Sequence, residues 1–300
     1  MIKQILVIFV IFTTYISPQV NEVHPEWIKI ADNLAFPEGP AWNDKYGLFA
    51  SNCYSDWILN YNNDVVDTFV VQPTNPINFS KTNGLTFDSE DNLYACDFGL
   101  GAILKFDMTG KCDTLITGYN GNKFNRPNDL AFDNKGNLYF TDPKSYGKDI
   151  LDGSLYKYNL VSETLTQVYT GLAFPNGIAF NLDYSQLYVC ESAKSRILLF
   201  ELDNSGKLKE PVYFAELPGG DPDGIAFDYE GNLYAAHFGG GAIYKIDPEG
   251  NILEKIITPG KKPSNIEFGG NDLKTLFITE DETNAIYKTN WEVEGLKLLR

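Results

Sequence analysis

The sequence predicts an all-β fold, a six-bladed β-propeller with four antiparallel strands per blade. A short segment occurs six times, in which an oxygen-bearing residue opens one strand and a tight turn leads directly into a second strand. Successive opening residues are 45, 45, 48, 47 and 42 positions apart, and a strand-rich period of this size is typical of propeller blades. The six opening residues are Glu38, Asn83, Asn128, Asn176, Asp223 and Asn265.

The remaining strands of each blade follow the first two along the chain. The turns between first and second strands read DSEDN, DNKGN and DYEGN, and their Asp, Asn and Gly residues suit tight hairpins. Alternating apolar and polar residues predict a fourth strand in most repeats, and no segment shows helical periodicity. The third strands are expected at 57–61, 102–107, 154–159, 196–202, 242–247 and 285–289.

A closed propeller needs one blade that is built from both ends of the chain. Residues 26–31 lie just before the first repeat, where the other repeats have their fourth strand. We expect this segment to pair with the sixth blade and to cover two sheet edges that would otherwise be exposed. The C-terminal segment GLKLLR (295–300) competes for the same position.

Length and composition fit one domain after an export signal. The chain has 300 residues and is 43% hydrophobic, which is enough for one propeller over residues 18–300. Residues 1–17 combine Lys3 with an apolar stretch from Ile5 to Ile16, which is the form of a signal peptide. The protein is therefore expected to be exported, periplasmic or secreted, although no small-residue cleavage site is visible. An uncleaved N-terminal anchor is the alternative.

Charge and cysteine content exclude several classes of protein. The chain has 24 basic and 40 acidic residues, a net charge of −16, which disfavours nucleic acid or an anionic membrane surface as a partner. We expect a monomer that binds a small molecule. The four cysteines lack CxxC spacing and are expected to be buried free thiols.

The six opening residues together predict a cation site. Each opening, such as FPEG or FPNG, is by itself an ordinary turn sequence. In a propeller, however, two carboxylates and four amides converge on one tunnel mouth, and this cluster is costly without a cation. Oxygen donors without Cys or His favour a hard divalent ion, with calcium first and magnesium or manganese after it. A low-specificity site of this kind can also accept zinc.

Four longer motifs resemble one known family. The chain is similar to the SMP-30/gluconolactonase/luciferin-regenerating-enzyme group of six-bladed propellers. The resemblance implies a catalytic divalent metal that is held by Glu38, Asn176 and Asp223, with Asn128 nearby. The motifs that carry it are FPEGPAW (36–42), FNRPNDLAFD (124–133) with YFTDP (139–143), FPNGIAF (174–180) and PDGIAFDYEGNLYAA (222–236).

The resemblance also implies substrate contacts around this metal. Arg126 and Asp129 flank Asn128, and similar positions contact sugar-like substrates in the family. Strand alternation, however, directs the side chain of Asp129 away from the tunnel if that of Asn128 points inward. Asp223 and Asp129 are the two candidates for the general base.

Three further residues are expected to face the substrate. Asn83 and Asn265 belong to the same ring, and His237 ends the second strand of the fifth blade at the same face. A neutral imidazole there suits proton transfer near pH 7, whereas a structural role is the alternative. The segment CDFG (96–99) stands where gluconolactonase-like relatives often have a histidine, so the substrate or the mechanism differs from that of a typical sugar lactonase.

These observations predict a metal-dependent hydrolase that opens a lactone, with a sugar lactone as the expected substrate. The metal polarises the ester carbonyl, and a carboxylate deprotonates the attacking water. One alternative is a related propeller phosphotriesterase with the same metal centre. The other is an exported calcium-binding propeller that recognises a ligand without turnover.

Overall fold

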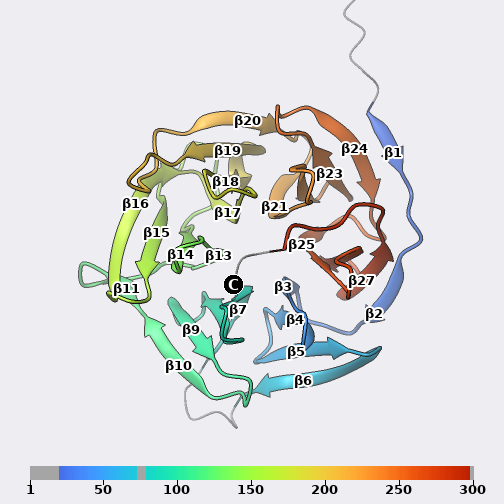
Figure 1. Cartoon of the computed structure of the whole chain (residues 1–300), viewed down its shortest axis with the longest axis horizontal. Helices are drawn as coiled ribbons and strands as arrows, with labels where there is room; N and C mark the ends of the chain where they lie inside the picture. Colours follow the sequence, from blue (N-terminus) through green and yellow to red (C-terminus); the bar gives the residue numbers. More distant parts are fainter. Residues whose placement is uncertain (1–19, 73–78, 298–300) are drawn as a thin grey trace, which may run out of the picture.

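Six antiparallel sheets surround a central tunnel in the computed structural model, which describes residues 20–72 and 79–297 (Figure 1). The predicted six-bladed propeller with four strands per blade is therefore confirmed. Blade one contains β3 (Pro37–Asn43), β4 (Gly47–Asn52), β5 (Trp57–Asn62) and β6 (Val65–Val71). Blade two contains β7 (Thr82–Phe87), β8 (Leu93–Asp97), β9 (Ala102–Phe106) and β10 (Cys112–Ile116). Blade three contains β13 (Leu130–Phe132), β14 (Asn137–Asp142), β15 (Gly153–Asn159) and β16 (Thr164–Leu172).

The other three blades repeat this order, with the first strand of each blade next to the tunnel. Blade four contains β17 (Pro175–Phe180), β18 (Gln186–Glu191), β19 (Arg196–Glu201) and β20 (Val212–Glu216). Blade five contains β21 (Asp221–Phe227), β22 (Leu233–Phe238), β23 (Ala242–Ile246) and β24 (Ile252–Ile257). Blade six contains β25 (Pro263–Gly269), β26 (Thr275–Glu280), β27 (Ala285–Asn290) and β2 (Ile28–Ala31).

The N-terminal segment closes the ring, as the sequence predicted. β2 pairs antiparallel with β27, with Ile28 opposite Lys288. Just before it, β1 (Asn21–Val23) pairs parallel with β24, so the N-terminal segment covers the outer edges of two neighbouring blades. This fifth strand of blade five was not predicted. The competing C-terminal segment instead crosses the far end of the tunnel, where the N–H of Leu296 donates to the carbonyl of Phe227 at 2.8 Å.

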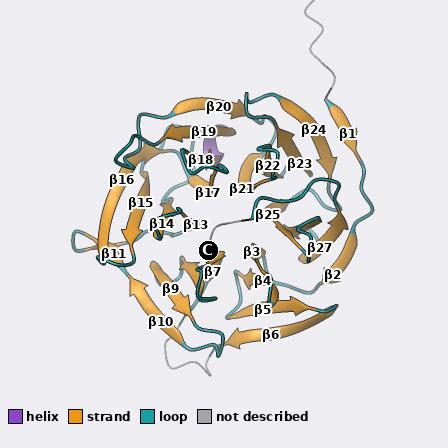
Figure 2. Cartoon of the chain, viewed as in Figure 1, coloured by secondary structure: helices purple, strands orange, loops and turns teal. Residues whose placement is uncertain are grey.

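Strands and tight turns make up nearly all of the described chain (Figure 2). The helical content of residues 20–72 and 79–297 is one 3₁₀ turn at Ser192–Lys194, and a short hairpin of β11 (Gly118–Tyr119) and β12 (Asn122–Lys123) lies between blades two and three. None of the described segments forms an apolar helix long enough to cross a membrane. The predicted signal peptide, residues 1–17, lies outside the described residues.

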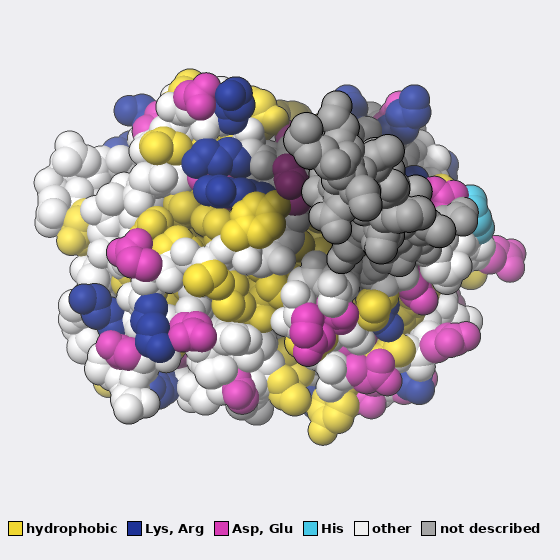
Figure 3. All heavy atoms as spheres, turned by 90° about the horizontal axis from the view of Figure 1, so that it is seen from above, with side chains coloured by type: hydrophobic (Ala, Val, Ile, Leu, Met, Phe, Trp, Pro, Cys, Tyr) yellow, Lys and Arg dark blue, Asp and Glu magenta, His cyan; other side chains and the backbone are white. Residues whose placement is uncertain are grey.

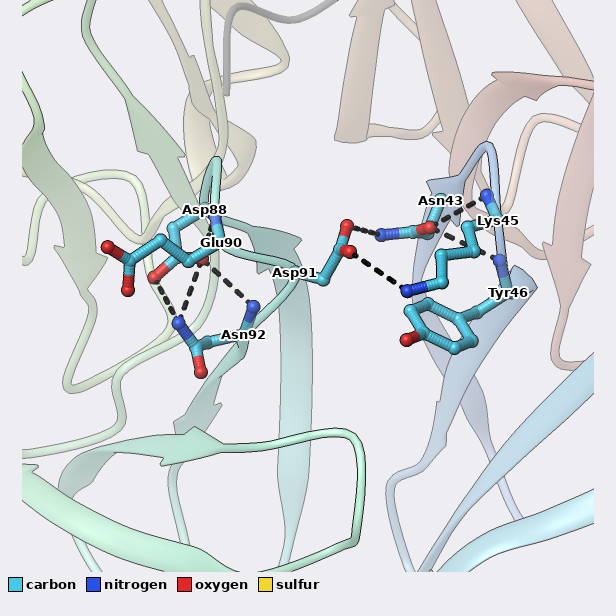
Figure 4. A network of polar contacts seen from close by, with 7 residues as sticks. All are labelled: Asn43, Lys45, Tyr46, Asp88, Glu90, Asp91 and Asn92. Carbon is cyan, nitrogen blue, oxygen red and sulfur yellow. Dashed lines mark hydrogen bonds and ion pairs between the residues drawn. The ribbon is translucent and has the colours of Figure 1, made fainter.

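The hairpin turns owe their shape to an aspartate and the asparagine that follows it by four positions. In Figure 4, Asp88 accepts hydrogen bonds from the backbone and side chain of Asn92 and from the N–H of Glu90. Asp133 holds Asn137 in the same way. Because these side chains replace backbone partners in the turn, the D-x-x-x-N pattern fixes where the second strand begins in blades two, three and five.

The hydrophobic core lies between blades and not within them. For example, Phe49 of β4 packs on Phe87 of β7, with ring centroids 5.2 Å apart. All four cysteines are buried and free, as predicted. On the side of the disc that Figure 3 shows, apolar side chains lie together near the middle, and charged residues of both signs surround them. The propeller is thus held together by contacts between neighbouring sheets, which leaves the strand starts at the tunnel mouth available for other roles.

Candidate functional site

A recurring β-bulge presents the opening residues to the tunnel mouth. In five blades the pairing of the first two strands shifts register at the opening, for example between Glu38 and Ala41 in blade one and between Pro222 and Ile225 in blade five. A bulge interrupts the alternation of side chains and re-aims the residue within it. The oxygen-bearing side chains therefore turn toward the mouth without disturbing the strands behind them.

Glycine after the opening residue lets neighbouring blades approach closely. A Cβ atom on Gly39 would overlap the carbonyl oxygen of Asn83, and one on Gly177 would overlap that of Asp223. Gly39 also has a φ of +49°, a conformation that glycine adopts without strain. Glycine is therefore required in the E-G, N-G and D-G pairs because neighbouring blades lie too close for a side chain, and not only because these pairs form turns.

Blade three has Asp129 at this glycine position, and the side chain fills the space. Its two carboxylate oxygens accept hydrogen bonds from the N–H groups of Leu130 at 2.9 Å and Ile178 at 3.2 Å. Asp129 thereby connects blade three to blade four and lines the tunnel below the mouth, as does Asn265. The alternation argument, which directed Asp129 away from the tunnel, does not hold at this irregular strand start. Burial raises the pKa of Asp129 to about 7.

One pocket of about 230 Å³ collects the predicted ligand set at the mouth. The side chains come from the openings of five different blades, at or just before the first strand, and the same pocket is lined by Asp221 and by several aromatic residues. Five ring residues line it: Glu38, Asn83, Asn128, Asn176 and Asp223.

The two ring carboxylates lack a positive partner. Glu38 is 3% exposed and Asp223 is 8% exposed. Burial raises the pKa of both, and their mutual repulsion raises that of Asp223 further. Within residues 20–72 and 79–297, neither takes part in an ion pair. A bound cation would supply the missing charge.

The donor set has the chemistry of a hard-cation site. No three His, Cys, Asp or Glu side chains of the described chain gather as a metal site, so a cation here needs the amide oxygens of Asn128 and Asn176 as well as the carboxylates. Asp281, at the end of β26, adds a further buried acid whose two oxygens have no hydrogen-bond partner. Burial and the nearby Glu38 raise the pKa of Asp281. Of these buried acids only Asp281 has a cation nearby among the described residues, Lys262, and the concentration of acidic groups fits a divalent cation at the mouth.

His237 lies behind the pocket and does not line it. The imidazole is 1% exposed, and its Nε2 is 2.8 Å from the carbonyl oxygen of Leu217. Burial lowers the pKa of His237, so the ring is neutral near pH 7. Because His237 does not line the pocket, the pocket does not support the predicted contact between His237 and the substrate.

The predicted substrate residue Arg126 does line the pocket. Its guanidinium carbon lies 5.3 Å from the ring centroid of Phe98 and 6.0 Å from that of Phe174. Phe98 belongs to the CDFG segment, so an aromatic wall stands where the sequence analysis noted a missing histidine. The aromatic wall was not predicted, because aromatic residues in loops carry no periodic signal.

Acidic residues at the ends of second strands fix the loops around the mouth. Asp97 accepts hydrogen bonds from the N–H groups of Ser80 and Lys81, and Asp142 accepts one from the N–H of Arg126 at 2.7 Å. This role of the acids was not predicted from the sequence. The signal for it is the acid that ends the second strand of blades two, three, four and six, in CD, TD, CE and TE.

Comparisons with known proteins place these features in one family. The profile described as "SMP-30/Gluconolactonase/LRE-like region" matches residues 109–281. A gluconolactonase of Zymomonas mobilis is 33% identical over 83% of this chain and 77% of its own length. A 6-deoxy-6-sulfogluconolactonase of Pseudomonas putida is 34% identical over 45% of this chain, but the match spans only 48% of that relative. The solved structure of a gluconolactonase from Xanthomonas campestris superposes with a TM-score of 0.78 at 27% identity, over 89% of this chain and 90% of its own.

Proposed function

Because the chain belongs to the SMP-30/gluconolactonase/LRE-like family, we propose that it is a divalent-cation-dependent hydrolase that opens a lactone. The observation that carries the proposal is the pocket itself, in which Glu38, Asn128, Asn176 and Asp223 meet. The names of the gluconolactonase relatives support a sugar lactone as the substrate. The apolar N-terminal stretch supports export of the protein, so that the activity would operate in the periplasm or outside the cell.

Glu38, Asn128, Asn176 and Asp223 would hold the cation, with calcium as the expected ion. When bound, the cation supplies an electrophile for the lactone carbonyl and neutralises the buried acids. Asn83, at the same pocket wall, can donate its side-chain N–H groups to a ring hydroxyl or to the carbonyl oxygen of the substrate. The amide side chains thus orient the lactone, while the carboxylates of Glu38 and Asp223 hold the cation at the floor of the pocket.

The attacking water needs a proton acceptor in the same pocket. Asp223 lines the pocket and can accept this proton at a carboxylate oxygen. Asp129, the other predicted base, lines the tunnel, and both of its oxygens already accept backbone N–H groups. We therefore assign proton transfer to Asp223, and we assign to Asp129 the positioning of the blade-three and blade-four strand starts.

A lactone panel tests this proposal. Metal-stripped protein should open a lactone only after calcium, magnesium, manganese or zinc is restored. A pH-stat trace should show one proton released for each lactone opened. Asp129→Asn should still bind the cation and retain turnover, because the amide oxygen can keep one of the two backbone hydrogen bonds.

The same assay separates the alternatives. Hydrolysis of a phosphotriester without hydrolysis of any lactone would support the phosphotriesterase function. A cation that raises the melting temperature while no ester is hydrolysed with any divalent ion would overturn the enzyme proposal. A calcium-binding recognition protein would then take its place.

A further inference from the structure

Two cations beside the candidate active site have no acidic partner. Lys81 and Arg126 are both exposed, and within residues 20–72 and 79–297 neither forms an ion pair. Twelve other basic residues of this acidic chain do form ion pairs. Other basic residues in the described part of the chain, such as Lys123 and Lys157, also lack an ion pair, so what distinguishes Lys81 and Arg126 is their position beside the pocket, where one anion could meet both charges.

Aromatic rings hold both cations against the pocket wall. The Lys81 ammonium lies 5.6 Å from the ring centroid of Tyr54 and 5.8 Å from that of Phe98. The Arg126 guanidinium lies between Phe98, which also contacts Lys81, and Phe174. All three rings line the pocket. Cation–π contacts restrict the positions of the two charges and leave their N–H donors unused.

The backbone beneath each cation is also fixed. The N–H of Lys81 donates to the buried Asp97 at 3.2 Å, and the N–H of Arg126 donates to the buried Asp142 at 2.7 Å. Asp97 and Asp142 accept these backbone hydrogen bonds, and among the described residues neither forms an ion pair with the side chain of Lys81 or Arg126. Two loops of adjacent blades thus present a pair of positioned positive charges at one side of the mouth.

A third lysine nearby differs in a useful way. Lys262 lies 5.7 Å from the ring centroid of Phe238 on blade five's side of the mouth. Its charge, however, lowers the pKa of Asp281, which shows that this lysine already has an acid beside it. The uncompensated positive charge is therefore confined to the side of the pocket that carries Lys81 and Arg126.

We propose that the pocket takes a lactone that carries an acidic substituent, a carboxylate, sulfonate or phosphate, bound by Arg126 and Lys81. This inference rests on the proposed lactonase function. The carbonyl end of such a substrate lies at the acidic floor with the cation, and the acidic end meets the two basic residues at the rim. Arginine suits this role because its planar guanidinium matches two oxygens of an anion at once.

Matched substrates test the proposal. Glucono-δ-lactone is compared with three analogues in which C6 carries a carboxylate, a sulfonate or a phosphate ester, and the measured quantity is the ratio of kcat/KM for the acidic lactone to that for the neutral one. At least one ratio should exceed about tenfold in the wild type, because a charge-assisted hydrogen bond is worth on the order of one tenfold step in affinity. The preferred acid identifies the substituent.

Variants assign the preference to the two cations. Arg126→Met should lower the ratio about tenfold, Arg126→Lys should restore part of it, and Lys81→Met should lower it several-fold. Raising the salt concentration should also lower the ratio, because exposed charges are screened. Lys157→Met is the matched control. Lys157 lies 5.4 Å from the ring centroid of Tyr139, away from the pocket, so its loss should leave the ratio unchanged.

The outcomes distinguish this inference from the proposed function. Hydrolysis of the neutral lactone with no preference for any acidic analogue, or a ratio that Arg126→Met does not change, would overturn the inference and leave the lactonase function intact. If no lactone is opened, calorimetry with 1,5-anhydroglucitol and its 6-phosphate decides the anion site alone. Equal affinity for these two ring compounds would then overturn it.

Discussion

The two ends of the central tunnel are built from the same six strands but have opposite chemistry. At the mouth, where the first strands begin, Glu38 and Asp223 are buried without a positive partner. At the far end, where these strands finish, the tunnel is lined mainly by apolar side chains and is crossed by Leu296. The aromatic residues of this end include Phe87, Phe132, Phe180, Phe227 and Phe268.

This contrast separates function from stability along a single strand. The register shift at the opening of five blades isolates the mouth from the regular pairing that follows. A side chain at the mouth can therefore be chosen for its chemistry, while the far end of the same strand supplies packing between blades. Substitutions at the two ends should change different properties of the protein.

The largest expected effect is at the mouth. Glu38→Ala and Asp223→Ala should each abolish lactone turnover, because each removes a charged ligand of the proposed cation site. In the absence of metal, the folded protein should keep or gain stability, since a buried acid without a partner is removed. Calorimetric titration with calcium and urea denaturation in the presence of a chelator measure the two effects. Wild-type turnover by Asp223→Ala would rule out the cation-centred mechanism.

The next effect is at the far end. Phe227 is 5% exposed and packs on Tyr188, with ring centroids 5.0 Å apart. Phe227→Ala should lower the free energy of unfolding by about 3–5 kcal/mol, because it leaves a cavity between blades. Calcium affinity of the folded variant should stay at the wild-type value. A large loss of calcium affinity would show that the two ends are coupled and that the contrast is too simple.

The sequence predicted the fold well because propeller repeats are visible in the chain. The spacing of the opening residues led to six blades and placed Glu38 and Asp223 at one pocket. The spacing did not predict that Asp129 lines the tunnel. Strand alternation does not apply at this residue, because it stands at the irregular strand start where other blades have glycine. Nor did the spacing lead to the rim of Phe98, Arg126 and Lys81, whose contacts depend on loops that are fixed by acids from neighbouring strands.

A smaller effect is expected from pH at the buried histidine. Burial lowers the pKa of His237 below its ordinary value of 6.5. The unfolded chain therefore takes up a proton below about pH 6.5 that the folded protein resists, and stability falls as the pH decreases from there toward the folded pKa. His237→Gln should remove this component. The difference in urea midpoint between wild type and variant, measured from pH 7.5 to 5.5, should shrink as the pH falls; parallel curves would contradict it.

The smallest effect is expected at the C-terminal segment that crosses the far end. Lys297 forms an ion pair with Asp44 at 2.9 Å, but the two side chains are 70% and 54% exposed. An exposed pair of this kind contributes about 0–1 kcal/mol, whereas Leu296 keeps its backbone hydrogen bond to Phe227 and its place in the tunnel. Lys297→Met should therefore change the urea midpoint very little and leave turnover unaltered. A loss as large as that of Phe227→Ala would mean that charge, and not packing, closes this end of the tunnel.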